Sequence, residues 1–286
     1  MLFCISDSLQ CSQYFLNVWQ SNFSSQSAAE TFLPGILNFS KAWHTAATFP
    51  FKTLINIWFE YDFDNIQKNN LKPSFFYAPA KGTHPFAVLT TSETILQTIS
   101  REPVSKETLI HLLHCLNEVP ENGWVSQIGR MFARGEESVR LFIQQIPRNG
   151  IRTYLDKIGY VYASEYELNL LLKNCYEFSD HVDLDIDVIH ITGDTIGLEC
   201  SFNEMEHALD FLDHLFSNRF CTQQKYEALN RYLRSLHLNN TKEFCPFFSH
   251  FKIVYHPLKP VRTKAYLGFA AKRSASKIIR TKPLKH

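Results

Sequence analysis

Hydrophobic and polar residues alternate in four pairs of short segments, and this period of two is typical of β-strands. The pairs are residues 53–63 with 72–79, 124–134 with 138–147, 181–191 with 195–202, and 249–257 with 261–271. Only short polar stretches separate the members of each pair, and the third pair turns at Thr192, Gly193 and Asp194, a connection that hairpins favour. Each pair therefore predicts an antiparallel hairpin.

Segments between the hairpins repeat their apolar residues with a helical period. Helices are predicted over residues 105–119, 151–160, 165–178, 204–220 and 222–236. The first begins at Ser105, a residue type that caps helices. The third carries a stripe made of Leu168, Leu171, Leu172 and Cys175. The fold class predicted is α/β (α+β), in which antiparallel hairpins alternate with helices.

Three regions follow from this pattern. Residues 1–50 are rich in aromatic residues and predict an N-terminal helical segment, with Tyr14, Phe15, Val18 and Trp19 at helical spacing. Residues 51–271 form the repeated strand–strand–helix domain, with a repeat of roughly 65 residues. Residues 272–286 form a basic tail without a carboxylate, which we interpret as a solvated terminus rather than a nucleic-acid contact.

Composition narrows the class of protein. The chain is 45% hydrophobic and 20% charged, which is typical of a folded domain, and its net charge of +1 offers no general attraction for nucleic acid. Its seven cysteines are scattered without a C-x-x-C pair, which is typical of reduced thiols. No apolar run reaches the length of a membrane span. We therefore expect a cytoplasmic protein without a nucleic-acid partner.

The alternation sorts each strand into an apolar and a polar face. The apolar face includes Ile55, Ile57 and Phe59, then Val182, Leu184, Ile186 and Val188, then Phe251, Ile253, Tyr255, Ala265, Leu267 and Phe269. The polar face includes Asn56, Trp58 and Glu60, then Asp183, Asp185 and Asp187, then Glu199, His250, Lys252, Lys264 and Tyr266. Helices with apolar stripes are expected to cover the apolar face.

Two architectures are compatible with this sorting. An open sheet places Glu60, Glu199, Lys252 and Lys264 in bulk water. A closed barrel ringed by helices makes them the lining of a hydrated chamber. Aromatic residues on the polar face, such as Trp58, favour the chamber, because ligand sites combine aromatic side chains with a few charges.

Several segments resemble one enzyme family in their layout. The closing hairpin FKIVYHPLKPVRTKAYLGF, the early hairpin IWFEYDF…KPSFFYAP, and VRLFIQQIP…IRTYLDKIGY are similar to parts of the ABBA, or PT-barrel, prenyltransferases. The resemblance covers about residues 52 to 270, and it is sharpest in KAYLGF. It implies a closed ABBA-type barrel with the helices outside.

The resemblance also implies a reaction. A transferase of this kind moves an isoprenyl group from an allylic diphosphate to an aromatic or peptide acceptor, and neither a metal nor another cofactor is implied. Lys252, Lys264 and, more weakly, Arg140 would contact the diphosphate, and Tyr266 would shield the carbocation. Glu60 or Glu199 would be the carboxylate that orients or deprotonates the acceptor.

Other hypotheses remain open. The same sheet could bind a small apolar ligand or a peptide during natural-product maturation without catalysis. Cys245 and His250 are spaced as a nucleophile and base could be in the guanidino-modifying penteins, although a buried thiol is the plainer interpretation. Asp183, Asp185 and Asp187 could bind a divalent cation, and the HLLH segment at residues 111–114 could hold zinc, although neither has a complete ligand set.

Overall fold

The computed structural model describes residues 2–5, 35–36, 38–39, 42–43, 54–60, 74–100, 103–132, 138–161, 164–236 and 244–271. It divides into two compact units. Unit 1 comprises Met1–Val161 with Leu184–Asp194, and unit 2 comprises Tyr162–Asp183 with Thr195–His286. Both combine antiparallel strands with helices, which confirms the predicted fold class at this level.

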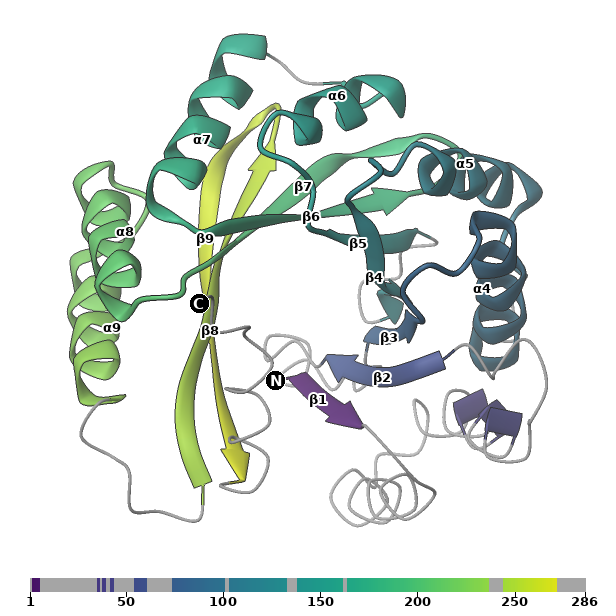
Figure 1. Cartoon of the computed structure of the whole chain (residues 1–286), viewed down its shortest axis with the longest axis horizontal. Coiled ribbons are helices and arrows are strands. Elements are labelled where there is room, and N and C mark those ends of the chain that lie inside the picture. Colours follow the sequence, from purple (N-terminus) through teal and green to yellow (C-terminus); the bar gives the residue numbers. More distant parts are fainter. Residues whose placement is uncertain are drawn as a thin grey trace. The chain divides into compact units, whose positions relative to one another are not determined.

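Strand segments in the described part of unit 1 pair antiparallel in chain order. They are β1 (Leu2–Ile5), β2 (Leu54–Glu60), β3 (Ser74–Pro79), β4 (Trp124–Arg130), β5 (Val139–Gln144) and residues 184–188 of β6 (His181–Val188). Figure 1 shows β2 to β5 in sequence order, with α4 (Pro85–Ser100) and α5 (Lys106–Asn117) beside them. Helix α6 (Gly150–Lys157) follows β5.

Helix α5 confirms its predicted start. The side chain of Ser105 accepts a hydrogen bond from the backbone N–H of Thr108, which satisfies one of the unpaired donors at the helix end. Leu112, Cys115 and Leu116 are buried.

Helix α4 was not predicted from the hydrophobic pattern. Pro85 occupies its first position, where a missing N–H costs nothing, and Val88, Ile95, Leu96 and Ile99 are buried. Serine and threonine lower the helix propensity of this segment. Their hydroxyl groups instead donate to carbonyls one turn earlier, for example Ser92 to Val88 at 2.7 Å.

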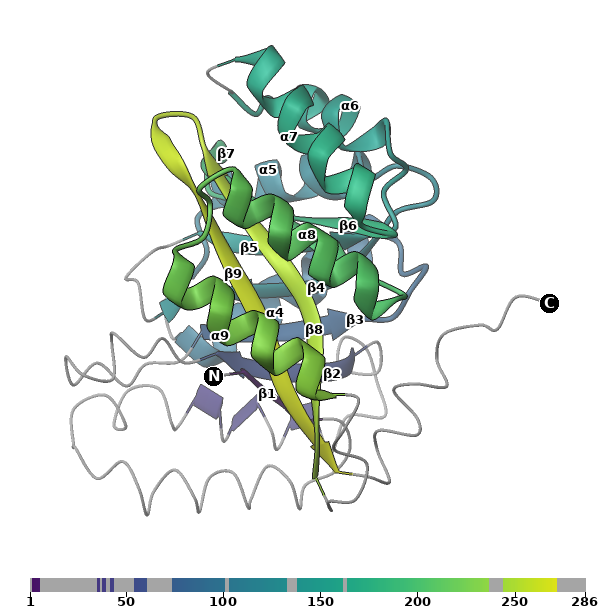
Figure 2. The ribbon, with the colours of Figure 1, turned by 90° about the vertical axis from the view of Figure 1, so that its left-hand side faces the viewer.

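Unit 2 is built on β7 (Thr192–Ser201), β8 (Phe244–His256) and β9 (Lys259–Ala271), which pair antiparallel in chain order; β7 belongs to this unit from Thr195 onward. Its helices are α7 (Glu165–Phe178), α8 (Met205–Ser217) and α9 (Gln223–Ser235). Figure 2 shows α8 and α9 crossing the same side of β8 and β9.

An aromatic core joins α8 to the sheet of unit 2. The ring of Phe211 lies 5.7 Å from that of Phe251 and 5.6 Å from that of Phe202. The predicted stripe of α7 is also confirmed, because Leu168, Leu171, Leu172 and Cys175 are all buried. The apolar side of this sheet therefore faces the helices, as the alternation predicted.

The strand faces hold with two exceptions. Most predicted apolar residues are buried, including Ile57, Phe59, Phe251 and Ile253. Ile55 is 50% exposed because the register shifts between Leu54 and Asn56. Leu267 is 45% exposed and lies beside a second register shift, between Phe248 and His250. A bulge reverses the alternation locally, and the sequence pattern does not reveal it.

The third hairpin also turns earlier than predicted. Strand β6 ends at Val188, the backbone N–H of Ile189 donates to the carbonyl of Ile191, and Thr192 to Asp194 already belong to β7. Tyr14 to Trp19 and the basic tail lie outside the described residues, as do the predicted boundaries at residues 50 and 272. No described helix has the length and hydrophobicity that crossing a bilayer requires.

Candidate functional site

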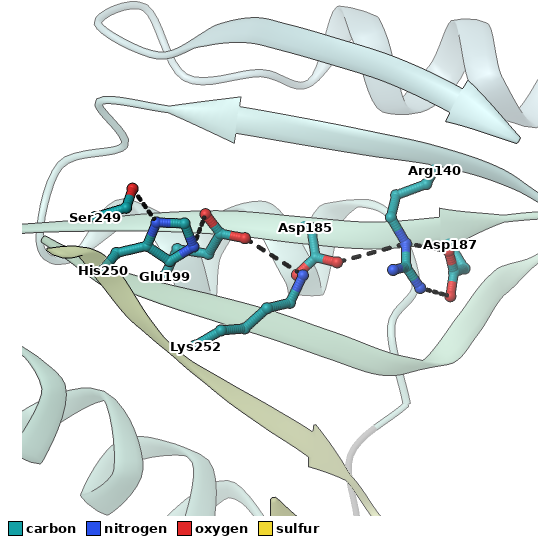
Figure 3. A network of polar contacts seen from close by, with 7 residues as sticks. All are labelled: Arg140, Asp185, Asp187, Glu199, Ser249, His250 and Lys252. Carbon is teal, nitrogen blue, oxygen red and sulfur yellow. Dashed lines mark hydrogen bonds and ion pairs between the residues drawn. The ribbon is translucent and has the colours of Figure 1, made fainter. Parts of the chain in front are cut away.

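Glu199 lies between two basic side chains on the polar face of unit 2. Lys252 Nζ lies 3.3 Å from its Oε1, and His250 Nε2 lies 2.9 Å from its Oε2 (Figure 3). The pairing of β7 with β8 explains the first contact, since Glu199 and Lys252 are direct cross-strand partners. Glu199 is 9% exposed and Lys252 is 7% exposed, so both charges are held largely away from water.

His250 is also fixed by two further side chains. The ring of Tyr266, its partner on β9, stacks on the imidazole with centroids 4.4 Å apart and planes inclined by 20°. At the edge of the ring, Nδ1 lies 2.9 Å from Ser249 Oγ. This face therefore holds an ordered series of groups, from the exposed Ser249 through His250 to the buried Glu199 and Lys252.

Lys264 occupies the next position on the same row. It is the cross-strand partner of Lys252, yet its side chain is exposed. Across β7, β8 and β9, this row therefore carries a carboxylate on Glu199, a buried ammonium on Lys252 and an exposed ammonium on Lys264.

A second polar cluster lies in unit 1. Arg140 of β5 donates two hydrogen bonds to its cross-strand partner Asp187, from Nε at 2.8 Å and from Nη2 at 2.7 Å. Its Nε also lies 3.4 Å from Asp185 Oδ2. Figure 3 labels these three residues as well.

The carboxylates keep Arg140 charged. Burial disfavours the charged guanidinium, but Asp185, Asp187 and Glu60 together outweigh it and raise the pKa of Arg140 above its ordinary value. Two carboxylates therefore contact the one guanidinium.

The structure thus places the predicted site residues in two groups. Glu199, Lys252, Lys264 and Tyr266 share one face of the sheet formed by β7, β8 and β9 in unit 2. Arg140 and the half-buried Glu60 belong to unit 1, where Glu60 acts on the guanidinium through its charge. The aromatic residues Trp58, Phe142 and Tyr266 are each half-buried.

Two further residues were not predicted as part of the site. His250 was placed on the polar face and named as a possible partner of Cys245 but was given no role in the site, and Ser249 was not considered. The spacing of His250 from Lys252 gives it the same face, and this signal was available in the sequence. The contact of Ser249 depends on the bulge, and the sequence contains no signal of that bulge. The side chain of Cys245 lies outside the described residues, so its hypothesis stays a prediction.

The remaining motifs have structural partners. Asp185 and Asp187 contact Arg140. In the HLLH segment, His111 Nε2 lies 3.0 Å from Thr192 Oγ1 and His114 Nε2 lies 3.1 Å from the carbonyl oxygen of Lys157. Among the described residues, no group of three histidine, cysteine or acidic side chains could hold a metal ion.

Unit 2 also has an open groove of about 520 Å³ between α7 and the turn from β8 to β9. Its apolar lining includes Leu170, Leu171, Phe220, Leu258, Pro260 and Val261. Glu167 and Lys259 add one charge of each sign. The volume is within the range of small-molecule sites.

The chain matches no family model, no curated protein and no solved structure. Functional inference therefore rests on the side chains of the two polar clusters and on the groove.

Proposed function

We propose that this protein is a transferase that moves an isoprenyl group from an allylic diphosphate to an aromatic or peptide acceptor. The observation that carries the proposal is the row Glu199, Lys252 and Lys264, with Tyr266 beside it on the same sheet face. A base, two cations and an aromatic ring are the groups that such a transfer requires. The finer fold assignment, a closed ABBA-type barrel, belongs to this proposal.

The two lysines have different tasks in the reaction. Lys264 is exposed and captures the diphosphate from solution, while the buried Lys252 stabilises the charge that grows as the allylic C–O bond breaks. The diphosphate leaves with the electron pair of that bond. The allylic carbocation then accepts an electron pair from the acceptor and forms the new bond.

Glu199 completes the transfer by accepting the proton that the acceptor loses. Its first oxygen contacts Lys252, and His250 still contacts its second oxygen when Lys252 turns to the diphosphate. The π-face of Tyr266 stabilises the carbocation in transit.

Unit 1 has a smaller part in this proposal. Arg140 already donates two hydrogen bonds to Asp187, so a diphosphate would have to displace a carboxylate to reach its guanidinium. We therefore assign the diphosphate chiefly to the lysines, and the acceptor proton to Glu199 in preference to Glu60.

The test is diphosphate release by the full chain, supplied with dimethylallyl, geranyl or farnesyl diphosphate and with aromatic acceptors such as N-acetyltyrosinamide and N-acetyltryptophanamide. Glu199→Gln keeps the shape of the side chain but cannot accept the proton, so formation of the prenylated acceptor, followed by mass spectrometry, should fall about 100-fold or more. Glu206→Gln, at an exposed position of α8, is the matched control and should keep full activity. Absence of release with every donor would refute the proposal.

The groove supports a second candidate function, the binding of a small apolar ligand without catalysis. Leu258 is 85% exposed and Leu170 is 44% exposed, so both offer apolar surface that a ligand could cover. This function needs neither Lys264 nor Glu199.

A fluorescent naphthalene derivative tests this candidate. Its binding should weaken severalfold in Leu258→Ser and Leu170→Ser, while Tyr166→Ser, at an exposed position of α7 outside the groove lining, should bind as the wild type does. Equal binding by all four proteins would remove the groove as a ligand site.

A further inference from the structure

The bulge in β8 changes the direction of one side chain on the polar face of unit 2. Phe248 pairs with Leu267 and His250 pairs with Tyr266, so two steps along β8 correspond to one step along β9. Ser249 is the additional residue. Neighbouring residues of a regular strand point to opposite faces, but here Ser249 Oγ lies 2.9 Å from the imidazole of its own neighbour (Figure 3).

The positions of the protons decide which atom donates in the contact between Ser249 and His250. The tautomer of His250 that suits both of its contacts carries the proton on Nε2, which faces Glu199 at 2.9 Å. Nδ1 then has the lone pair, and Ser249 Oγ donates to it. The contact of Nε2 with Glu199 does not have the angle of a regular hydrogen bond, which is common in resting sites that tighten when substrate binds.

The imidazole of His250 has a fixed orientation in this arrangement. Tyr266 stacks on the imidazole, and Lys252 contacts the second oxygen of Glu199, so both the ring and its carboxylate have fixed orientations. Ser249 is exposed, and a substrate can therefore approach its oxygen. A nucleophile in contact with a base, and a base oriented by a third group, are the parts of a serine site for acyl transfer.

We propose that Ser249 is a nucleophile for activated carboxylic esters, with His250 as its general base and Glu199 as the orienting carboxylate. The Ser249 oxygen bonds to the acyl carbon and passes its proton to His250 Nδ1. The ester C–O bond breaks, and the departing alkoxide takes that proton as an alcohol. Water, deprotonated by His250 in turn, then releases the carboxylic acid and restores Ser249.

This activity goes beyond the proposed transferase, although both use Glu199. Ser249→Ala distinguishes them, because it should abolish acylation and leave diphosphate release in place. The acylation of Ser249 and the release of diphosphate are therefore separate assays, and either proposal can fail while the other stands.

The test is labelling of the full chain with a fluorophosphonate, in which the serine oxygen displaces fluoride from phosphorus. Mass spectrometry identifies the labelled serine and measures the rate at which it is labelled. General-base assistance should make Ser249 react about 100-fold faster than Ser217, an exposed serine of α8 in the same unit. In His250→Gln the base is missing, so Ser249 should be labelled at least tenfold more slowly. In Ser217→Ala, Ser249 should be labelled at the wild-type rate.

Two results would overturn the inference. One is equal or absent labelling of Ser249 and Ser217 in the wild type, a comparison that requires no variant to fold. The other is an unchanged rate in a folded His250→Gln protein, as judged by its circular dichroism.

Discussion

Glu199 illustrates how a buried charge is tolerated in this protein. Its two oxygens contact Lys252 and His250, so neither the carboxylate nor the ammonium is left without compensation. Taking two charges out of water costs several kcal/mol each, and their attraction mainly offsets that cost. The pair therefore adds little net stability, but the loss of one member leaves the other buried with less compensation for its charge.

Lys252→Met should lower the free energy of unfolding by about 3–5 kcal/mol, because it leaves Glu199 buried beside His250 alone. Urea denaturation measures the change. Lys157 also contacts a carboxylate, Glu118 at 2.9 Å, but both side chains are substantially exposed. Lys157→Met should therefore cost far less than Lys252→Met. Equal effects of the two substitutions would contradict the assigned burial.

His111 should make stability depend on pH. Burial lowers its pKa below 6.5, and the charges of His114 and His190 lower it further. As the pH falls through 6.5, the unfolded chain binds a proton more readily than the folded chain, so stability decreases.

His111→Gln removes this titration while its amide can still donate to Thr192 Oγ1. Thermal melts between pH 7.5 and 5.5 should therefore show a smaller loss of stability in the variant. Some loss should remain, because burial also lowers the pKa of His214. An identical pH dependence in both proteins would show that His111 does not contribute.

At the scale of single residues, the sequence predicted which face a side chain occupies but not how deeply it is buried. Alternation placed Lys252 and Lys264 on one face, and the strand pairing makes them neighbours. One is buried and the other exposed, because depth depends on what covers each position. The alternation of side chains along a strand does not show which other parts of the protein pack over each position.

Elements follow local rules where a cap or a periodic stripe is present. Ser105 begins α5, and the leucines of α7 are buried as their spacing predicted. Helix α4 was missed because its many hydroxyl side chains resemble a loop, although they bond within the helix. The bulges at Ile55 and Ser249 were missed because an extra residue in one strand is defined only by its partner strand.

The cap of α5 can be tested by substitution. Ser105→Ala removes the acceptor for the Thr108 N–H and should cost about 1 kcal/mol of unfolding free energy. Ser105→Asp restores an acceptor and should recover most of that loss, as measured by urea denaturation. An alanine variant as stable as the wild type would mean that the cap contributes nothing.

Gly129 allows β3 and β4 to approach closely. A Cβ at this position would overlap the carbonyl oxygen of Phe75 and the ring of Phe76. Gly129→Ala should therefore destabilise the protein by about 1–3 kcal/mol, which a thermal melt would detect. At Gly123 the nearest atom would stand 3.2 Å away, so Gly123→Ala should have a smaller effect. The reverse order would contradict the pairing of β3 with β4.

At the scale of the whole molecule, hydrophobic patterning was sufficient to predict antiparallel hairpins alternating with helices. It could not decide between an open sheet and a closed barrel, because both satisfy the same two-faced strands. The division into two units was not predicted either, since it falls within β6 and β7, where the alternation continues without a break. The function proposed for the molecule depends on one of these units, in which four predicted site residues share a sheet face.

Calorimetric titration of the full chain with dimethylallyl diphosphate tests the central claim most directly, because it asks whether this face binds a diphosphate. The wild type and Lys225→Gln, which changes an exposed lysine of α9, should bind equally, and Lys264→Gln should bind at least about tenfold more weakly. No binding by the wild type, or equal binding by all three proteins, would contradict it.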